Sequence, residues 1–339
     1  RRFMALADPW LGYVDGVPQL LLGSESIPVL RPEPGHELVQ QALEADDVVH
    51  AINTLPLPAY EGDPGGTAEF RLMLLRHREV FKGLGCVRGV QHHILLQPDT
   101  QPHVEKKRIR SPAQQKVEKE LVDDLLARGV LEHSQSAWAT YPVLVRKKNG
   151  QWRFTSDFRQ LNKVTDPDAY PMQDIRYVLH WLGQRLVFTT VDLRDSFFQI
   201  ELAPGSRHLT ATRTAAGHVQ YGRMPQGLRN SMATLQRTMD HVNRGDEDAM
   251  AYVDDLQCGT ESVERHLDAV DRLLGRLLAA GFRLRLEKCE FATRSVETLG
   301  HVVGDGQIRP SPRHVAAVAL PPPSDAHSLL RFMGTIRFF

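Results

Sequence analysis

Apolar residues recur at helical spacing in two stretches of the chain, and a third stretch has a helix-forming composition. The first follows Ser111-Pro112, where a serine N-cap precedes proline at the first helical position, and it continues until Gly129. The second extends from Val263 to Gly281 with its apolar residues on one face. The third, predicted from its composition, is the segment SMATLQRTMDHV after Gly227. The pattern therefore predicts three helices.

Three other stretches have the pattern of β-strands. The apolar run LVFTTV, residues 186–191, predicts a buried strand that leads directly into Asp192. Residues 249–260, AMAYVDDLQCGT, predict a strand, an acidic turn and a second strand. Residues 141–159 contain two β-rich runs separated by Asn149-Gly150, a strong hairpin signal. The order of strand, helix, hairpin and helix predicts an α+β fold, in which a small antiparallel sheet carries helices on one face.

The first part of the chain differs from the rest in composition. The stretch from Glu33 to Gly66 mixes proline, glycine and acidic residues without periodicity, which indicates a linker or a loosely packed surface. Residues 1–70 hold three basic and eleven acidic side chains, and the chain has no net charge. The remaining residues therefore carry eight more basic than acidic groups, so an acidic leader precedes a basic body that suits nucleic acid.

Several classes of protein are excluded by composition. No apolar run reaches the roughly 18 residues of a membrane span, and the first residues lack the apolar core and cleavage site of a signal peptide. We expect neither membrane association nor secretion. The three cysteines, Cys86, Cys258 and Cys289, have no zinc-ligand spacing, so we expect reduced and mostly buried thiols. The histidines also lack ligand spacing.

The adjacent carboxylates Asp254 and Asp255 are the strongest candidates for chemistry. Neighbouring side chains of a strand point to opposite faces, so a tight turn is needed to bring the two together. A buried carboxylate pair requires a positive partner, and a third carboxylate at another strand end, Asp192, would complete a site for two magnesium ions. An Asp-Asp pair alone more often marks a solvated turn. Apolar residues on both sides of this pair, such as Met250 and Leu256, oppose that interpretation.

These segments resemble those of reverse transcriptases. YVDD at 252–255 resembles the YxDD box, and VDLRDSFFQI resembles the segment that holds the first catalytic aspartate. WRFTSDFRQLNKVT, YGRMPQGLRNSMATLQRTMD, LRLEKCEF and ETLGHVV follow in the family's order. The similarity extends from about Glu69 to the last residue and is closest to LTR retroelements of the gypsy and retroviral type. It implies a right-hand polymerase fold with fingers, palm and thumb. The implied activity is RNA-directed and DNA-directed DNA synthesis by a pol polyprotein fragment of a retrotransposon.

The resemblance also implies a catalytic site. Two Mg²⁺ ions, with Mn²⁺ as an alternative, would be held by the carboxylates of Asp192, Asp254 and Asp255 and by the backbone carbonyl of Val191. Lys288 matches a lysine proposed to protonate the leaving pyrophosphate, although a lysine at such a place is more often plain surface.

Five further residues match nucleotide-binding positions of the family. Lys147 and Arg153 match residues that grip the triphosphate, which suits the phosphate chemistry of both side chains. Phe197 matches the aromatic steric gate beneath the deoxyribose, and in a strand Phe198 would point to the opposite face and pack in the core. Gln226 and Gly227 belong to the PQG box. The alternatives are a solvated basic hairpin tip for Lys147 and Arg153 and core packing for Phe197.

Other matched positions differ from the family or suggest a structural role. The DFRxLNK signature, formed by Asp157, Arg159, Asn162 and Lys163, is expected to be a salt-bridged junction that shapes the nucleotide pocket. The sequence departs from the gypsy pattern at Met232, Leu235, Thr212 and the pair Asp195-Ser196, although the form of that pair is close to the retroviral one. None of these departures removes a catalytic group, so they put processivity and fidelity in doubt rather than the chemistry.

The expected domains are a leader and three polymerase parts. Residues 1–68 form an acidic leader or linker, whose first part resembles the tail of a retropepsin-like domain without its DTG or DSG triad. Residues 69–185 form fingers interleaved with palm, 186–260 the palm with the carboxylates, and 261–339 the palm helix, thumb and start of the connection. A ribonuclease H, an integrase and a complete protease are expected to lie outside this sequence.

The expected partners are an RNA or DNA template with its primer and deoxynucleoside triphosphates, with no membrane and with an oligomeric state left open. We expect a cytoplasmic location, including virus-like particles. The alternative function is an inactive or domesticated reverse-transcriptase-like protein that binds nucleic acid. A two-metal nuclease or nucleotide cyclase is disfavoured because neither uses a PQG box with a steric gate.

Overall fold

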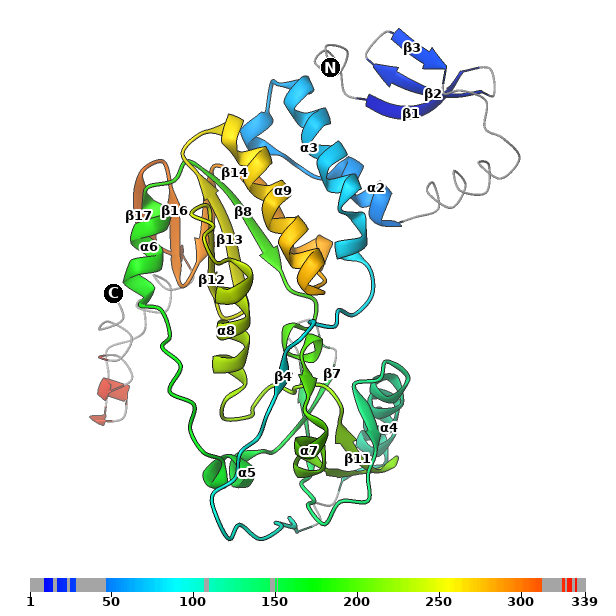
Figure 1. Ribbon diagram of the computed structural model, residues 1–339, viewed down its shortest axis with the longest axis vertical. Helices are drawn as coiled ribbons and strands as arrows, with labels where there is room; N and C mark the ends of the chain where they lie inside the picture. The colour runs from blue at the N-terminus through cyan, green and yellow to red at the C-terminus, as the bar shows by residue number, and fades with distance from the viewer. Residues whose placement is uncertain are drawn as a thin grey trace.

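The computed structural model is built around a four-stranded antiparallel sheet with the strand order β12-β13-β8-β14. Its strands are β8 (Val187–Asp192), β12 (Ala249–Tyr252), β13 (Asp255–Thr260) and β14 (Glu290–Thr293). Figure 1 shows this sheet in the upper part of the molecule. The structure describes residues 9–14, 17–22, 25–28, 47–106, 110–146, 150, 152–312, 325–326, 328–330 and 333.

Helices cover both faces of this sheet. Val187 and Val191 of β8 pack in the main core with α9 (Val263–Ala280), and α8 (Ser231–Val242) lies against β12. Phe188 points the other way and joins a second core cluster with α6 (Ile175–Gly183). Our prediction of helices on one face only was therefore wrong, because the short helix α6 has its own buried apolar side that packs against Phe188.

The three predicted helices are confirmed. The first is α4 (Pro112–Ala127), where the Ser111 hydroxyl accepts a hydrogen bond from the Gln114 backbone and Gln114 caps Ser111 in return. Helix α9 ends at Gly281, which has a φ of 92°. A side chain at Gly281 would begin only 2.1 Å from the carbonyl oxygen of Cys86, so both conformation and space require glycine there.

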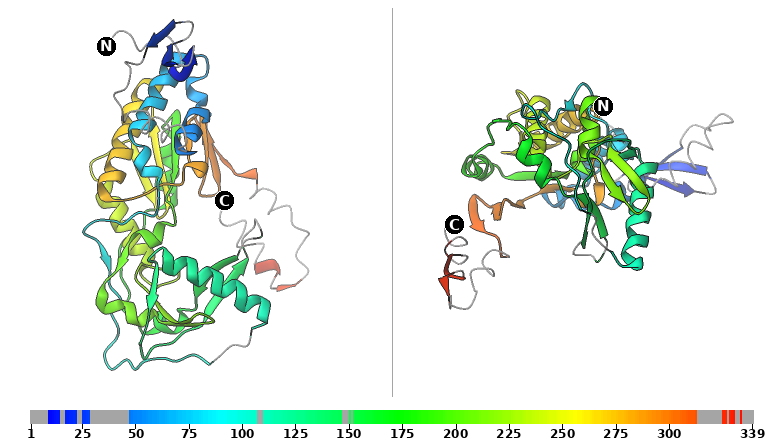
Figure 2. Two further views of the ribbon diagram at one scale, coloured as in Figure 1. Left: turned by 90° about the vertical axis from the view of Figure 1, so that its right-hand side faces the viewer. Right: turned by 90° about the horizontal axis from the view of Figure 1, so that it is seen from below.

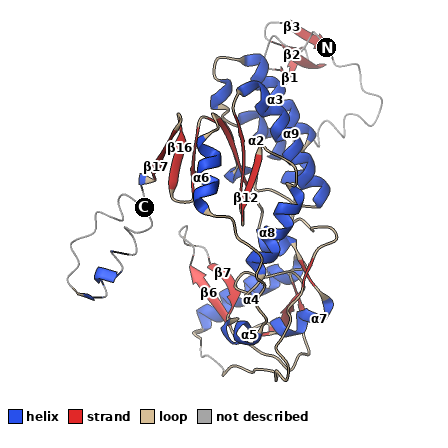
Figure 3. Cartoon of the chain, turned by 60° about the vertical axis from the view of Figure 1, so that its left-hand side comes forward, coloured by secondary structure: helices blue, strands red, loops and turns tan. Residues whose placement is uncertain are grey.

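The lower part of the molecule contains the predicted hairpin and α4 (Figures 2 and 3). Strands β6 (Pro142–Arg146) and β7 (Trp152–Ser156) pair antiparallel with Arg146 opposite Trp152. The hairpin is confirmed, but five residues connect its strands, so the loop is longer than a two-residue Asn-Gly turn. The chain also forms shorter elements before and after this hairpin. They are β4 (Gln91–His92), β5 (Leu131–His133), α5 (Arg159–Val164), β9 (Glu201–Leu202), α7 (Pro204–Arg207), η4 (His208–Thr210), β10 (Thr212–Thr214) and β11 (Gly217–Tyr221).

Residues 33–46 of the predicted linker lie outside the described residues, and the described part, residues 47–66, is not a linker. Residues 47–66 belong to a packed segment, in which Ile52 and Tyr60 are buried and the Tyr60 hydroxyl donates to the Val263 carbonyl at 3.1 Å. The prediction was wrong for this part because a few apolar side chains among prolines suffice to anchor short elements. They are α2 (Asp47–Thr54), η1 (Pro58–Tyr60), α3 (Pro64–Arg76) and η2 (Arg78–Phe81).

One three-stranded sheet is formed near the start of the sequence and another near its end. The first contains β1 (Pro9–Val14), β2 (Val17–Leu22) and β3 (Glu25–Pro28), and the second contains β15 (Ser295–Thr298), β16 (His301–Gly304) and β17 (Gln307–Pro310). The second sheet lies against α6. Within the described ranges, no helix has the length and apolar character needed to cross a bilayer. All three cysteines are free thiols; Cys258 and Cys289 are buried and Cys86 is exposed, so the prediction of reduced and mostly buried thiols is confirmed.

Candidate active site

Strand pairing brings the predicted carboxylates to one edge of the central sheet. Asp192 ends β8 and lies directly opposite Asp255, the first residue of β13. Tyr252 pairs with Asp255 across the hairpin, so Val253 and Asp254 form its two-residue turn. Val253 has a φ of 57°, in the left-handed region that β-branched residues rarely adopt. The turn that the sequence required to converge the carboxylates is therefore present and strained.

The electrostatics of this edge suit a hard divalent cation. The pKa of Asp255 is raised first by burial and then by the nearby charges of Asp254 and Asp192. A bound cation would relieve this repulsion, and carboxylate oxygens are the donors that magnesium prefers. Among the residues described, however, no three acidic, histidine or cysteine side chains are gathered closely enough to hold an ion in this conformation. Val191 is buried in β8 opposite Leu256.

Lys288 lies beside the carboxylates, in the short helix η5 (Leu286–Lys288). Its Nζ is 3.5 Å from Oδ2 of Asp192, and about half of its side chain is exposed. The backbone of the same segment is tied to β8, because the Arg285 amide donates to the Asp192 carbonyl at 2.8 Å. In the sequence, only the family resemblance indicated that Lys288 belongs to this site. In the structure, the fold brings Lys288 next to Asp192.

A buried glutamine that sequence reasoning missed holds the catalytic turn. Oε1 of Gln236, on α8, accepts a hydrogen bond from the Val253 amide at 2.7 Å. Its Nε2 donates to the Ala251 carbonyl at 3.0 Å and to Oδ1 of Asp240 at 2.8 Å. The side chain is fully buried. In the sequence, the only signal for this role of Gln236 is that a polar residue stands among the apolar residues of a predicted helix.

A cavity of about 550 Å³ gathers three of the predicted nucleotide-binding residues, which are Arg153, Phe197 and Gln226. It lies between α4, β7 and the segment that follows β8. Gly227 and the three carboxylates predicted to be catalytic do not line it. Lys147 lies outside the described residues.

The two adjacent phenylalanines do not follow the expected strand geometry. Phe197 and Phe198 lie in the short helix η3 (Ser196–Gln199), and both line the cavity. Phe197 is buried, whereas Phe198 is partly buried and stacks on Tyr221 with ring centroids 6.3 Å apart. The argument that Phe198 points to the opposite face was wrong, because strand alternation does not apply in a 3-10 turn.

The DFRxLNK segment supports the loop that contains Gln226 and Gly227. Asp157 and Arg159 form an ion pair at 2.6 Å, as the sequence predicted. The Asn162 amide donates to the Gly227 carbonyl at 2.8 Å and accepts from the Arg229 backbone at 2.8 Å. Gly227 has a φ of 94°, which explains glycine at this position. The predicted ion pair is therefore present, while the role of the segment in shaping a nucleotide pocket stays a prediction.

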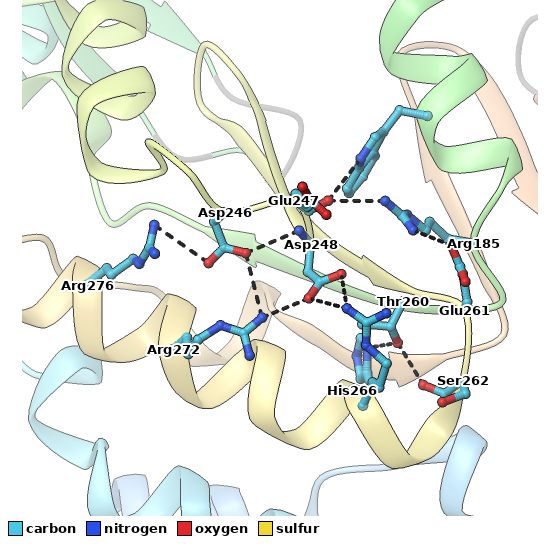
Figure 4. A network of polar contacts seen from close by, with 12 residues as sticks. Arg185, Asp246, Glu247, Asp248, Thr260, Glu261, Ser262, His266, Arg272 and Arg276 are labelled. Carbon is cyan, nitrogen blue, oxygen red and sulfur yellow. Dashed lines mark hydrogen bonds and ion pairs between the residues drawn. The ribbon is translucent and has the colours of Figure 1, made fainter.

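The end of the catalytic hairpin away from Asp254 is fixed by an ion-pair network, shown in Figure 4. Asp248 is buried and contacts Arg272 at 2.7 Å and Arg265 at 3.4 Å. Asp246 lies 3.7 Å from both Arg272 and Arg276. All three arginines belong to α9, so the network fastens the loop before β12 to this helix.

His266 of α9 connects the two central strands. Its Nε2 lies 2.8 Å from the hydroxyl of Thr189 on β8, and its Nδ1 lies 3.0 Å from the hydroxyl of Thr260 on β13. Since Thr260 donates its own proton to the Ser262 carbonyl, it accepts from Nδ1 of the neutral ring (Figure 4). Burial lowers the pKa of His266 to about 4.

Comparisons with known proteins identify relatives of this chain. Residues 145–303 match the family model described as reverse transcriptase (RNA-dependent DNA polymerase). The retrovirus-related Pol polyprotein from transposon opus of Drosophila melanogaster is 33% identical over 303 residues, which cover 85% of this chain and 30% of the relative. The chain spans only 21% to 30% of the length of the first curated relatives that it matches.

Solved structures show the same fold. The foamy viral protease-reverse transcriptase in complex with double-stranded DNA has a TM-score of 0.76, and its complex with an RNA/DNA hybrid has a TM-score of 0.71. Both are 20% identical to this chain and cover 93% of it, while the chain covers 54% and 42% of theirs. Residues 145–303 therefore form a domain of the reverse transcriptase family, and the chain has a right-hand polymerase fold.

Proposed function

We propose that this chain is an RNA-directed and DNA-directed DNA polymerase of a retroelement. One observation carries the proposal: Asp192 and Asp255 face each other across two paired strands, with Asp254 in the adjoining turn. Three carboxylates at one sheet edge suit nucleotidyl transfer, whose main requirements are charge neutralisation and positioning.

Two divalent ions, Mg²⁺ or alternatively Mn²⁺, would be held by Asp192, Asp254 and Asp255, with the Val191 carbonyl as a further oxygen. When bound, such ions activate the primer 3′-hydroxyl and neutralise the charge that develops on the phosphates. The protein's own contribution is to hold the carboxylates in place. Strand pairing fixes Asp192 and Asp255, and Gln236 fixes the backbone on both sides of the turn.

The cavity beside the carboxylates would receive the deoxynucleoside triphosphate. Arg153 offers a planar fork for phosphate oxygens, and Lys147 would add a second cation from the hairpin. Phe197 would lie under the sugar, while Gln226 and Gly227 would contact the base pair. Lys288 would give its proton to the leaving pyrophosphate, and its distance of 3.5 Å from Asp192 supports that role.

The template and primer would be RNA or DNA strands, as in the complexes solved for the similar foamy viral protein. We assign fingers to residues 69–185, palm to 186–260 and palm helix, thumb and connection to 261–339. The packing of residues 47–66 extends the polymerase unit into the leader that we had placed at 1–68. A cytoplasmic location remains our prediction.

Primer extension on poly(rA)-oligo(dT) with magnesium tests the proposal. The wild type should extend the primer, and Asp192→Asn, Asp254→Asn and Asp255→Asn should each abolish extension while the fold and template binding remain. Template binding without extension by the wild type would instead support the inactive, nucleic-acid-binding alternative. Extension retained in all three variants would remove the two-metal assignment.

A further inference from the structure

Two charged residues of the cavity, Arg128 and Asp195, have no role in the site described so far. They line it together with Arg153, Phe197 and Gln226. Arg128 is the C-cap of α4, and Asp195 follows Asp192 by three residues. The two residues therefore join the helix of the lower part of the molecule to the turn that follows the catalytic strand.

Asp195 adopts an unfavourable backbone conformation at the start of η3. Its φ of 48° and ψ of 53° lie in the left-handed region, where a non-glycine residue persists only if its surroundings hold it. Its carbonyl accepts from the Phe198 amide at 2.8 Å, so this residue sets the direction of the turn that carries Phe197. Any movement of Asp195 would move the Phe197 ring.

Two arginines hold the Asp195 carboxylate, one on each oxygen. Nη2 of Arg128 lies 2.5 Å from Oδ2, and Nη2 of Arg285 lies 3.2 Å from Oδ1. Only about a third or less of each of these side chains is exposed, so the ion pairs are partly shielded from water. Nη1 of Arg128 also contacts Asp124, one helical turn earlier, at 3.3 Å.

We propose that Arg128 and Asp195 are a positioning pair that sets the affinity and the sugar selection of the nucleotide site. This inference rests on the polymerase function proposed above. The pair fixes η3 beneath the cavity, and the guanidinium of Arg128 neutralises a carboxylate that would otherwise repel the triphosphate. The catalytic carboxylates are held separately, by strand pairing and by Gln236. Loss of the pair therefore changes nucleotide binding more than the maximal rate.

The test uses steady-state incorporation of dCTP and CTP by Arg128→Gln, Arg128→Lys, Asp195→Asn and the double variant Arg128→Gln/Asp195→Asn. Arg128→Gln should raise KM for dCTP about tenfold, which corresponds to about 1.4 kcal/mol, with kcat nearly unchanged. The preference for dCTP over CTP should fall. Arg128→Lys should be intermediate, and the double variant should recover part of the KM because it no longer has a carboxylate that has lost one of its two arginine partners.

Arg207→Gln is the matched control, because it breaks another partly shielded arginine–carboxylate pair, with Glu132 at 3.1 Å, and neither residue lines the cavity. It should retain the wild-type KM and sugar preference. An unchanged KM and preference in Arg128→Gln, an equal effect in Arg207→Gln, or a loss confined to kcat would overturn the proposal.

The proposed function and this inference fail in different ways. If the wild type extends primers but Arg128→Gln behaves like it, only the inference fails. If the wild type does not extend primers, the proposed function fails. Equilibrium binding of dTTP to the template–primer complex then decides the inference, followed through tryptophan fluorescence because Trp152 lines the cavity. Equal affinities of wild type and Arg128→Gln would refute the pair's role in that case as well.

Discussion

The buried Gln236 side chain should control the rate of catalysis although it is too deep in the protein to touch a substrate. We consider Gln236→Leu, which keeps a similar volume but removes both polar groups. The change leaves the Val253 amide and the Ala251 carbonyl without their hydrogen bonds to α8. These two groups flank the turn between Tyr252 and Asp254, so the catalytic carboxylates lose the contact that fixes their backbone.

The expected magnitudes follow from this geometry. Each buried polar group left without a partner costs about 1–3 kcal/mol, so the loss of two partners should lower the unfolding free energy by about 2–6 kcal/mol. Val253, with a φ of 57°, stores a further strain of about 1–3 kcal/mol that favours relaxation of the turn once the glutamine is gone. A displacement of about 1 Å at reacting groups can lower a rate about a hundredfold, so kcat should fall by this order.

Steady-state primer extension at several dTTP concentrations measures this effect, together with urea unfolding. We expect kcat to fall while KM for dTTP stays close to wild type, because Gln236 does not line the nucleotide cavity. Thr238→Val is the control, since its buried hydroxyl bonds only to the Thr234 carbonyl of the same helix, at 2.7 Å. An unchanged kcat in folded Gln236→Leu, or an equal decrease in Thr238→Val, would refute the reasoning.

Three other predictions concern nucleic acid, sugar and pH. Template–primer affinity should fall steeply with salt. For each neutralised phosphate, the logarithm of the binding constant should fall by about 0.7–0.9 per tenfold increase in salt concentration. A binding constant that does not change with salt in filter binding would contradict a basic body facing nucleic acid. Phe197→Val should admit ribonucleotides more than Phe198→Val does, and an unchanged ratio of dCTP to CTP incorporation would place the gate elsewhere. The neutral His266 should contribute stability that is complete above pH 6.5 and decreases by about 3 kcal/mol as the pH falls towards 4. Urea unfolding of wild type and His266→Asn at pH 7.5 and pH 5 tests this. An equal decrease in unfolding free energy between the two pH values in both proteins would contradict the prediction.

The elements of the catalytic hairpin could be predicted because local sequence determines them. An apolar run that ends at Asp192 and two β-rich runs around Asp254 have the period of strands, and the cap at Ser111 marks a helix start. These signals need no knowledge of the tertiary structure. The family resemblance then indicated which carboxylates belong together, and strand register placed two of them opposite each other.

The supporting contacts could not be predicted because they join residues far apart in the chain. Asn162 meets Arg229 across 67 positions, and Arg128 meets Asp195 across the same separation. No periodicity records such a pairing. The error at Phe198 has a different origin: it assumed extended backbone where the positive φ of Asp195 begins a 3-10 turn, and a single aspartate gives no sign of that conformation.

The two ends of the hairpin formed by β12 and β13 differ in what they contribute to stability and to function. At the end away from Asp254, buried Asp248 is matched by Arg265 and Arg272. At the other end, burial and then the charges of Asp254 and Asp192 raise the pKa of Asp255. Removing a repelling charge should not destabilise the fold, so Asp254→Asn should melt at the wild-type temperature or above it in EDTA while losing activity. Arg272→Ala should instead lose about 1–3 kcal/mol of stability, since it weakens the pairing of a buried carboxylate. A lower melting temperature for Asp254→Asn than for Arg272→Ala, measured by calorimetry, would show that the catalytic carboxylates stabilise the fold and that other interactions outweigh their mutual repulsion at this edge.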